Sequence, residues 1–76
     1  MIMDHLNAKQ TFIIFSLESY KNRLHKTGKE ALEDFKIYNV FEYLEEGFDV
    51  LHTQSMPYVV DEIMVYIKNR NENISR

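Results

Sequence analysis

Glycine and proline are scarce in this chain of 76 residues, and their positions limit what it can fold into. The two glycines, Gly28 and Gly47, and the one proline, Pro57, all lie between segments whose apolar residues recur with helical spacing. Folds made of short strands need many turns, and turns are commonly built from glycine and proline. The sequence therefore favours a few helices over a set of strands, and it predicts an all-α fold.

Length and composition fit one small domain. We expect a single helical domain over residues 1–76, with a core over about residues 7–68 and a polar tail over residues 69–76. The chain has no cysteine, so its five phenylalanines and five tyrosines must supply much of the core. No stretch approaches the roughly 20 apolar residues of a membrane span, and the first ten residues lack a signal-peptide pattern. We expect a cytoplasmic protein that does not bind membranes.

Capping residues predict about four helices, two long and two short. The first long helix begins near Asp4 or Asn7 and runs to about Lys26, with the glycine at position 28 as its stop. The second helix opens with Thr27-Gly28-Lys29-Glu30, which has the spacing of a capping box, and ends at Asn39. Both predicted starts rest on side chains that satisfy backbone N–H groups left free at the beginning of a helix.

The second half of the chain predicts a short helix and then a long one. The short helix covers residues 40–46, and the segment at 48–51 is too short to classify by its apolar spacing. Ser55 is a suitable cap and Pro57 a suitable first-turn residue for the last helix. We expect the first and last helices to pack together and the two short ones to cover them.

Apolar spacing also predicts which side chains form the core. On the first helix, the expected buried face carries Ile13, Leu17, Tyr20 and Leu24, widened by Phe12 and Phe15. Over the whole chain, six side chains are expected to be largely buried: Phe15, Leu17, Phe35, Leu44, Ile63 and Ile67.

Acidic residues concentrate in the middle of the chain. Residues 27–62 hold nine of the twelve carboxylates and two of the nine lysines and arginines, which gives this segment a net charge of −7. Such a segment repels phosphate and attracts basic surfaces. Two neighbouring short helices could suggest a helix-turn-helix, but the would-be recognition helix, VFEYLEE, carries three carboxylates and no cation. We therefore expect no nucleic-acid partner.

Residues with catalytic or metal-binding chemistry do not form recognisable motifs. The three histidines are spread along the chain, and two isolated glycines cannot form a phosphate-binding loop. Glu46, Asp49 and His52 are spaced so that they drift off one helical face, and His52 and Ser55 lack an evident third partner for nucleophilic catalysis. We expect no catalytic residues, no metal and no cofactor.

The polar stretch His52-Thr53-Gln54-Ser55 has two interpretations. It could be a buried corner whose side chains satisfy backbone groups, or a contact patch for another protein. The same choice applies to the tyrosines, which could be half-buried core or contact residues, and to the acids, which could be a solvated face. If these residues bind a partner, the candidates are Glu42, Tyr43, Glu45, Glu46, Asp49, His52, Gln54 and Tyr58.

The order of several short motifs resembles a small bacterial family known as domain of unknown function 3791. These motifs are Glu-x-Tyr-Lys at 18–21, Tyr-Leu-x-Glu at 43–46 and Leu-His-Thr-Gln at 51–54. The resemblance covers about residues 12–67. It implies an all-helical module with no known enzymatic activity. It also implies genes that often lie beside those of ADP-ribosyltransferase-like proteins, in an arrangement similar to toxin–antitoxin or effector–immunity pairs.

These observations lead to one expected function and two alternatives. We expect a non-catalytic interaction module that binds a protein partner with a basic surface, which the resemblance suggests could be an ADP-ribosyltransferase-like protein. The first alternative is a homo-oligomeric structural protein, such as a homodimer, since small cores often gain from self-association. The second alternative is a small metal-dependent or hydrolytic enzyme.

Overall fold

The computed structural model describes residues 7–74, with side chains described to residue 72, and this part of the chain is all-α. Its helices are α1 (Ala8–Arg23), α2 (Gly28–Ile37), α3 (Val40–Glu46), α4 (Phe48–Leu51) and α5 (Met56–Ile74). The predicted fold class is confirmed. The segment that the sequence left unclassified, residues 48–51, is the single helical turn α4.

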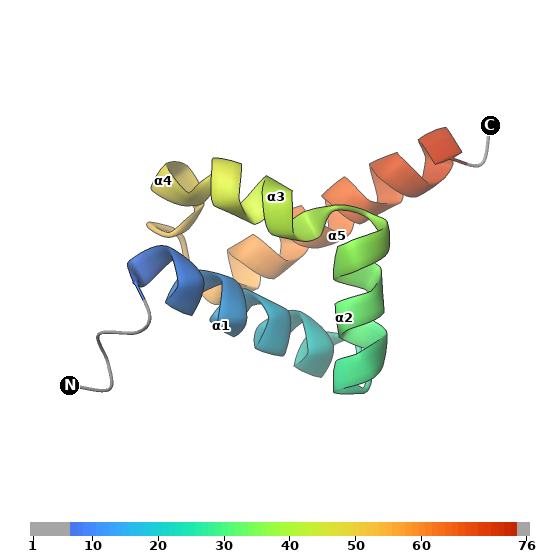
Figure 1. The fold of residues 1–76 in the computed structure, drawn as a ribbon, viewed down its shortest axis with the longest axis horizontal. Helices are drawn as coiled ribbons and strands as arrows, with labels where there is room; N and C mark the ends of the chain where they lie inside the picture. Colours follow the sequence, from blue (N-terminus) through green and yellow to red (C-terminus); the bar gives the residue numbers. More distant parts are fainter. Residues whose placement is uncertain (1–6, 75–76) are drawn as a thin grey trace.

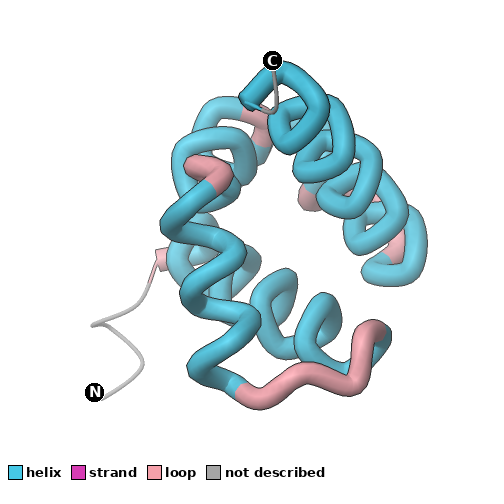
Figure 2. The backbone as a smooth tube through the Cα atoms, turned by 90° about the vertical axis from the view of Figure 1, so that its right-hand side faces the viewer, coloured by secondary structure: helices cyan, strands magenta, loops and turns pink. Residues whose placement is uncertain are grey.

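The helices surround one core. Helix α1 contacts α5, α2 and α3, so the two long helices do pack together as predicted. Helix α2 stands across one end of α1 and α3, while α4 lies at the other end, near the start of α1 (Figure 1). The view from the side shows the helices arranged around a shared interior rather than in flat layers (Figure 2).

Helix α1 begins where the sequence predicts and ends earlier. The Asn7 carboxamide oxygen accepts from the Gln10 N–H at 2.8 Å, and the Gln10 side chain accepts in return from the Asn7 N–H at 3.1 Å. This reciprocal pair confirms Asn7 as the cap. The alternative start, Asp4, lies outside the described residues.

The stop of α1 is His25 and not Gly28, so the predicted end near Lys26 was wrong. His25 is in the left-handed conformation, with φ of 54°. The Lys26 N–H bonds the Lys21 carbonyl at 3.0 Å, which satisfies a carbonyl that the ended helix leaves free. Gly28 is instead the first residue of α2.

The boundaries of α2 are confirmed. The Thr27 hydroxyl accepts from the Glu30 N–H at 3.1 Å, and the Glu30 carboxylate accepts from the Thr27 N–H at 2.9 Å. Asn39 has φ of 58° and ends the helix in the left-handed conformation that asparagine tolerates. Helix α3 then begins at the next residue, Val40.

Helix α5 starts at the predicted cap and extends past residue 68. The Ser55 carbonyl accepts from the Val59 N–H at 3.0 Å, and its hydroxyl accepts from the Tyr58 N–H at 3.4 Å. The helix then continues through Asn69 to Ile74, a stretch that the sequence suggested was a tail. No glycine or proline follows Pro57, so no residue forces an end.

Phe35, Leu44 and Ile63 are confirmed as core residues, since each is 0% exposed. Leu17 and Ile67 are half-buried against this core. The prediction for Phe15 was wrong, because 59% of its surface is exposed. Phe41, on α3, is also only partly buried, whereas the neighbouring Val40 is fully buried.

The buried face of α1 matches the predicted one only in part. It carries Phe12, Ser16 and Tyr20, spaced four residues apart. Phe12 and Tyr20 were predicted there, whereas Ile13, Leu17 and Leu24 of the predicted stripe are half-buried beside this face. The apolar run at residues 12–15 covers all sides of a helical turn, so the spacing alone does not single out one face.

The core is ordered by aromatic contacts and one polar group at its edge. The ring of Phe35 lies 5.3 Å from the ring of Tyr20 and 5.3 Å from that of Phe41. The Tyr20 hydroxyl donates to the Asp34 Oδ2 at 2.6 Å, and this carboxylate oxygen also lies 2.8 Å from the Lys26 ammonium nitrogen. Burial and the neighbouring carboxylate together raise the pKa of Tyr20 above its ordinary value.

Candidate functional site

Four of the predicted partner-binding residues share one exposed face. Glu42, Glu45, Glu46 and Asp49, called here the acidic face, lie on the side of α3 and α4 opposite the buried Val40, Leu44 and Leu51. None of the four makes an ion pair with another residue in the described part of the chain. The acidic face is therefore a group of four solvated carboxylates.

A lysine from another helix borders the acidic face. Lys9, near the start of α1, lines a hollow of about 340 Å³ together with Glu45, Glu46 and Asp49. Its ammonium nitrogen lies 5.8 Å from the ring centroid of Phe48, in a cation–π contact. One cation thus faces three carboxylates, and the surface here stays negative.

Phe48 joins the acidic face to a second feature, an apolar hollow. Its ring meets the ring of Phe12 edge-on at 5.6 Å and stacks on the His52 imidazole at 4.3 Å, with an angle of 11° between the two planes. The hollow has a volume of about 490 Å³ and is lined mainly by Ala8, Phe12, Phe15, Phe48, His52 and Met56. It lies between the start of α1, α4 and the start of α5.

Sequence reasoning missed this apolar hollow. Phe15 was expected in the core, and Phe48 belongs to the segment at 48–51, which the apolar spacing could not classify. The one indication in the sequence was the apolar run at residues 12–15, because four consecutive apolar residues cover more of a helix than a single core-facing stripe. Only the fold decides which of those side chains remains at the surface.

The turn after α4 is exposed, so its interpretation as a buried corner was wrong. All four residues from His52 to Ser55 are exposed. Their polar groups still bond nearby atoms: His52 Nδ1 lies 2.6 Å from the Phe48 carbonyl oxygen, and the Thr53 hydroxyl donates to the Val50 carbonyl at 2.7 Å. The Gln54 amide reaches the Thr53 hydroxyl at 3.4 Å. The His52 and Thr53 side chains thus bond carbonyl groups at the end of α4 while they remain exposed to solvent.

The two predicted tyrosines are on different helices, Tyr43 on α3 and Tyr58 in the first turn of α5. Tyr43 stacks on Tyr66 of α5, with ring centroids 4.2 Å apart, and is half-buried. Burial, followed by the Glu62 carboxylate, raises the pKa of Tyr43. Tyr58 is 45% exposed, more than a half-buried core residue would be. The eight predicted residues therefore divide into the four carboxylates of the acidic face, two tyrosines on different helices and two residues of the turn, and of the eight only His52 lines the apolar hollow.

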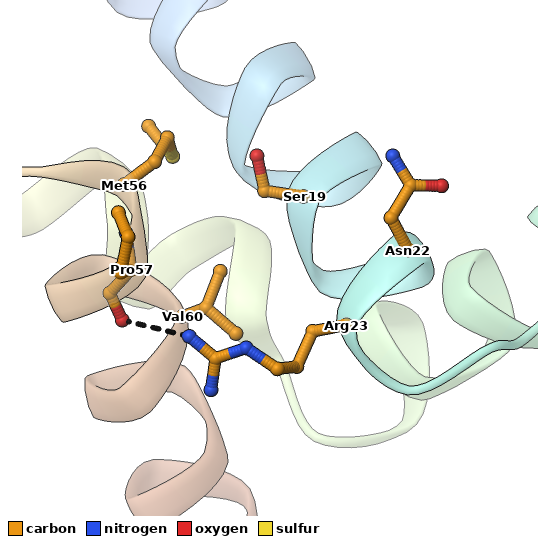
Figure 3. Close-up of a pocket in the computed structure, with 6 residues that line it drawn as sticks. All are labelled: Ser19, Asn22, Arg23, Met56, Pro57 and Val60. Carbon is orange, nitrogen blue, oxygen red and sulfur yellow. Dashed lines mark hydrogen bonds between the residues drawn. The ribbon is translucent and has the colours of Figure 1, made fainter.

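A third hollow, between α1 and α5, is occupied by protein contacts. Ser19, Asn22 and Arg23 line it from α1, and Met56, Pro57 and Val60 from α5, around about 360 Å³ (Figure 3). The Arg23 guanidinium donates to Asp61 at 2.7 Å and to the Pro57 carbonyl at 3.2 Å. Because these bonds already engage its only charged group, this hollow is a seam between two helices.

The described residues form neither a metal-binding group nor a membrane-spanning helix. Within that part of the chain, no three His, Cys, Asp or Glu side chains are grouped so that they could hold a metal ion, and this applies to Glu46, Asp49 and His52. No helix there is long and apolar enough to cross a membrane.

Comparison with known proteins identifies the family. The model of DUF3791, described as a protein of unknown function, matches residues 11–70. That range includes the acidic face, Phe15 and Phe48. No curated protein and no solved structure matches the chain. Since the family model covers most of the sequence, the predicted family is confirmed, and the chain belongs to the DUF3791 family.

Proposed function

We propose that this protein is a non-catalytic interaction module that binds a basic surface of another protein through its acidic face. The observation that carries the proposal is the arrangement of Glu42, Glu45, Glu46 and Asp49, which are exposed together without an ion pair to a described residue. The face is presented by a short helix and a helical turn whose opposite side is fully packed, so it is held in place by the core.

Electrostatics favour a basic protein as the partner. Like charges placed side by side repel each other, and a cationic surface relieves that repulsion when it binds. The same carboxylates disfavour nucleic acid, whose phosphates carry the same sign. In this proposal the protein acts in the cytoplasm with the product of a neighbouring gene, as an antitoxin or immunity protein would act with an ADP-ribosyltransferase-like protein.

Charge reversal on the acidic face tests the proposal. Glu45→Lys combined with Glu46→Lys changes the last turn of α3, where cations suit the helix dipole, so the fold should keep its stability. The matched control combines Glu33→Lys with Glu72→Lys, two exposed residues on α2 and α5. Both double variants change the net charge by the same amount, so only the position of the change differs.

The measurement is association with a partner captured by the full chain from cells and then purified. The acidic-face variant should associate at least about tenfold more slowly at low salt, and the control should stay close to wild type. The wild-type association rate should also fall as salt rises. A partner that binds both variants at the wild-type rate, at every salt concentration, would contradict the proposal.

A further inference from the structure

We infer that the apolar hollow receives a large apolar side chain from the same basic segment that binds the acidic face. The partner would then be a segment that carries lysine or arginine beside one exposed aromatic or long aliphatic residue. This inference rests on the proposed function and adds a second, apolar contact to it.

The walls of the hollow suit an apolar side chain. Phe15 and Phe12 both line the hollow, and they are 59% and 7% exposed, respectively. The volume of about 490 Å³ lies within the range of sites that bind small ligands. An apolar side chain placed there would remove Phe15 from water, which is the usual source of binding energy at the centre of an interface.

The position of the hollow links it to the acidic face. Phe48 forms part of its wall, and Lys9, whose ammonium nitrogen lies 5.8 Å from the Phe48 ring, lines the acidic side. The two surfaces therefore meet at these two residues. A single segment that crosses this border would place its apolar residue in the hollow and its cations on the carboxylates beyond it.

Charge argues against a second copy of this chain as the occupant. In a two-fold symmetric dimer the same patch faces itself, so an interface centred on the hollow would bring two acidic faces toward each other. Like charges at such an interface disfavour association. The complementary occupant is a basic segment of another protein.

The test selects peptides from a random 16-residue display library on the immobilised full chain, and measures the selected peptides against variants. Phe15→Ala removes the exposed ring, and Ala8→Trp fills the hollow from the exposed start of α1. The matched control is Ile14→Ala, which removes a neighbouring side chain that is 50% exposed and does not line the hollow. Thermal melting checks that each variant is folded.

Selected peptides should combine cations with a large apolar residue. Their affinity should fall at least about tenfold with Phe15→Ala and with Ala8→Trp, and less than about threefold with Ile14→Ala. Basic peptides weakened only by Glu45→Lys with Glu46→Lys would overturn this inference and leave the proposed function standing. Apolar peptides without cations, indifferent to that charge reversal, would overturn both. The inference is also overturned if no peptide is enriched, or if light scattering shows a dimer that Phe15→Ala dissociates.

Discussion

Replacing Tyr20 with phenylalanine should make the stability of this protein less sensitive to high pH. Tyr20 is 3% exposed, and its hydroxyl donates to the Asp34 carboxylate at 2.6 Å. Phenylalanine keeps the ring and its contact with Phe35, so the substitution removes one hydrogen bond to a charged group without leaving a large cavity. At pH 7 we expect Tyr20→Phe to lower the free energy of unfolding by about 1.5–3 kcal/mol.

The pH dependence follows from the raised pKa of Tyr20. Burial and the Asp34 carboxylate raise this pKa above the ordinary value of 10.0, so the folded protein keeps the phenol proton to a higher pH than the unfolded chain does. The stabilisation is complete below the unfolded pKa and is lost as pH rises above it, by about 1.4 kcal/mol per pH unit. At pH 11 wild type should have lost about 1.4 kcal/mol that Tyr20→Phe cannot lose.

Urea unfolding followed by far-ultraviolet circular dichroism at pH 8, 9, 10 and 11 measures this effect. The gap in unfolding free energy between wild type and Tyr20→Phe should narrow by about 1.4 kcal/mol across that range. Tyr43, whose pKa is also raised, is present in both proteins and cancels in the difference. Tyr58→Phe is the control, because Tyr58 is 45% exposed. A gap that stays constant from pH 8 to pH 11 would refute the placement of the Tyr20 hydroxyl against Asp34.

Two further predictions concern helix α2. Phe35→Ala should lower the free energy of unfolding by about 3–5 kcal/mol, a large part of the roughly 4–11 kcal/mol expected for a chain of this length. Leu32→Ala, at a position 37% exposed, should lower it by no more than about 1 kcal/mol. Similar melting temperatures for the two variants would show that Phe35 is not a central core residue. Thr27→Ala should cost about 0.5–2 kcal/mol because the Glu30 N–H loses its acceptor, and Thr27→Ser should restore most of it. Chemical denaturation measures both, and equal stability of the alanine and serine variants would argue against the cap.

The local sequence determined where most helices begin and end. The reciprocal bonds of Thr27 with Glu30, the left-handed Asn39 and the cap at Ser55 all join atoms a few residues apart, so the residues that form them can be recognised in the sequence. The scarcity of glycine and proline excluded a fold built on turns, and the exposed carboxylates of the acidic face follow from their helical spacing. The end of α1 departed from the expectation because a histidine, rather than the nearby glycine, adopts the left-handed conformation.

Only the tertiary structure decided which sides of the helices face the core. The apolar run at residues 12–15 surrounds α1, and the contacts of that helix with α2, α3 and α5 select Phe12 for burial and leave Phe15 exposed. The apolar hollow needs Phe12 together with Phe48 and Met56, and Phe12 lies far from the other two in the sequence. The exposure of the turn at residues 52–55 likewise depends on where α4 and α5 pack. Helical spacing describes each segment separately, whereas burial depends on contacts between segments, and those arise only when the chain has folded.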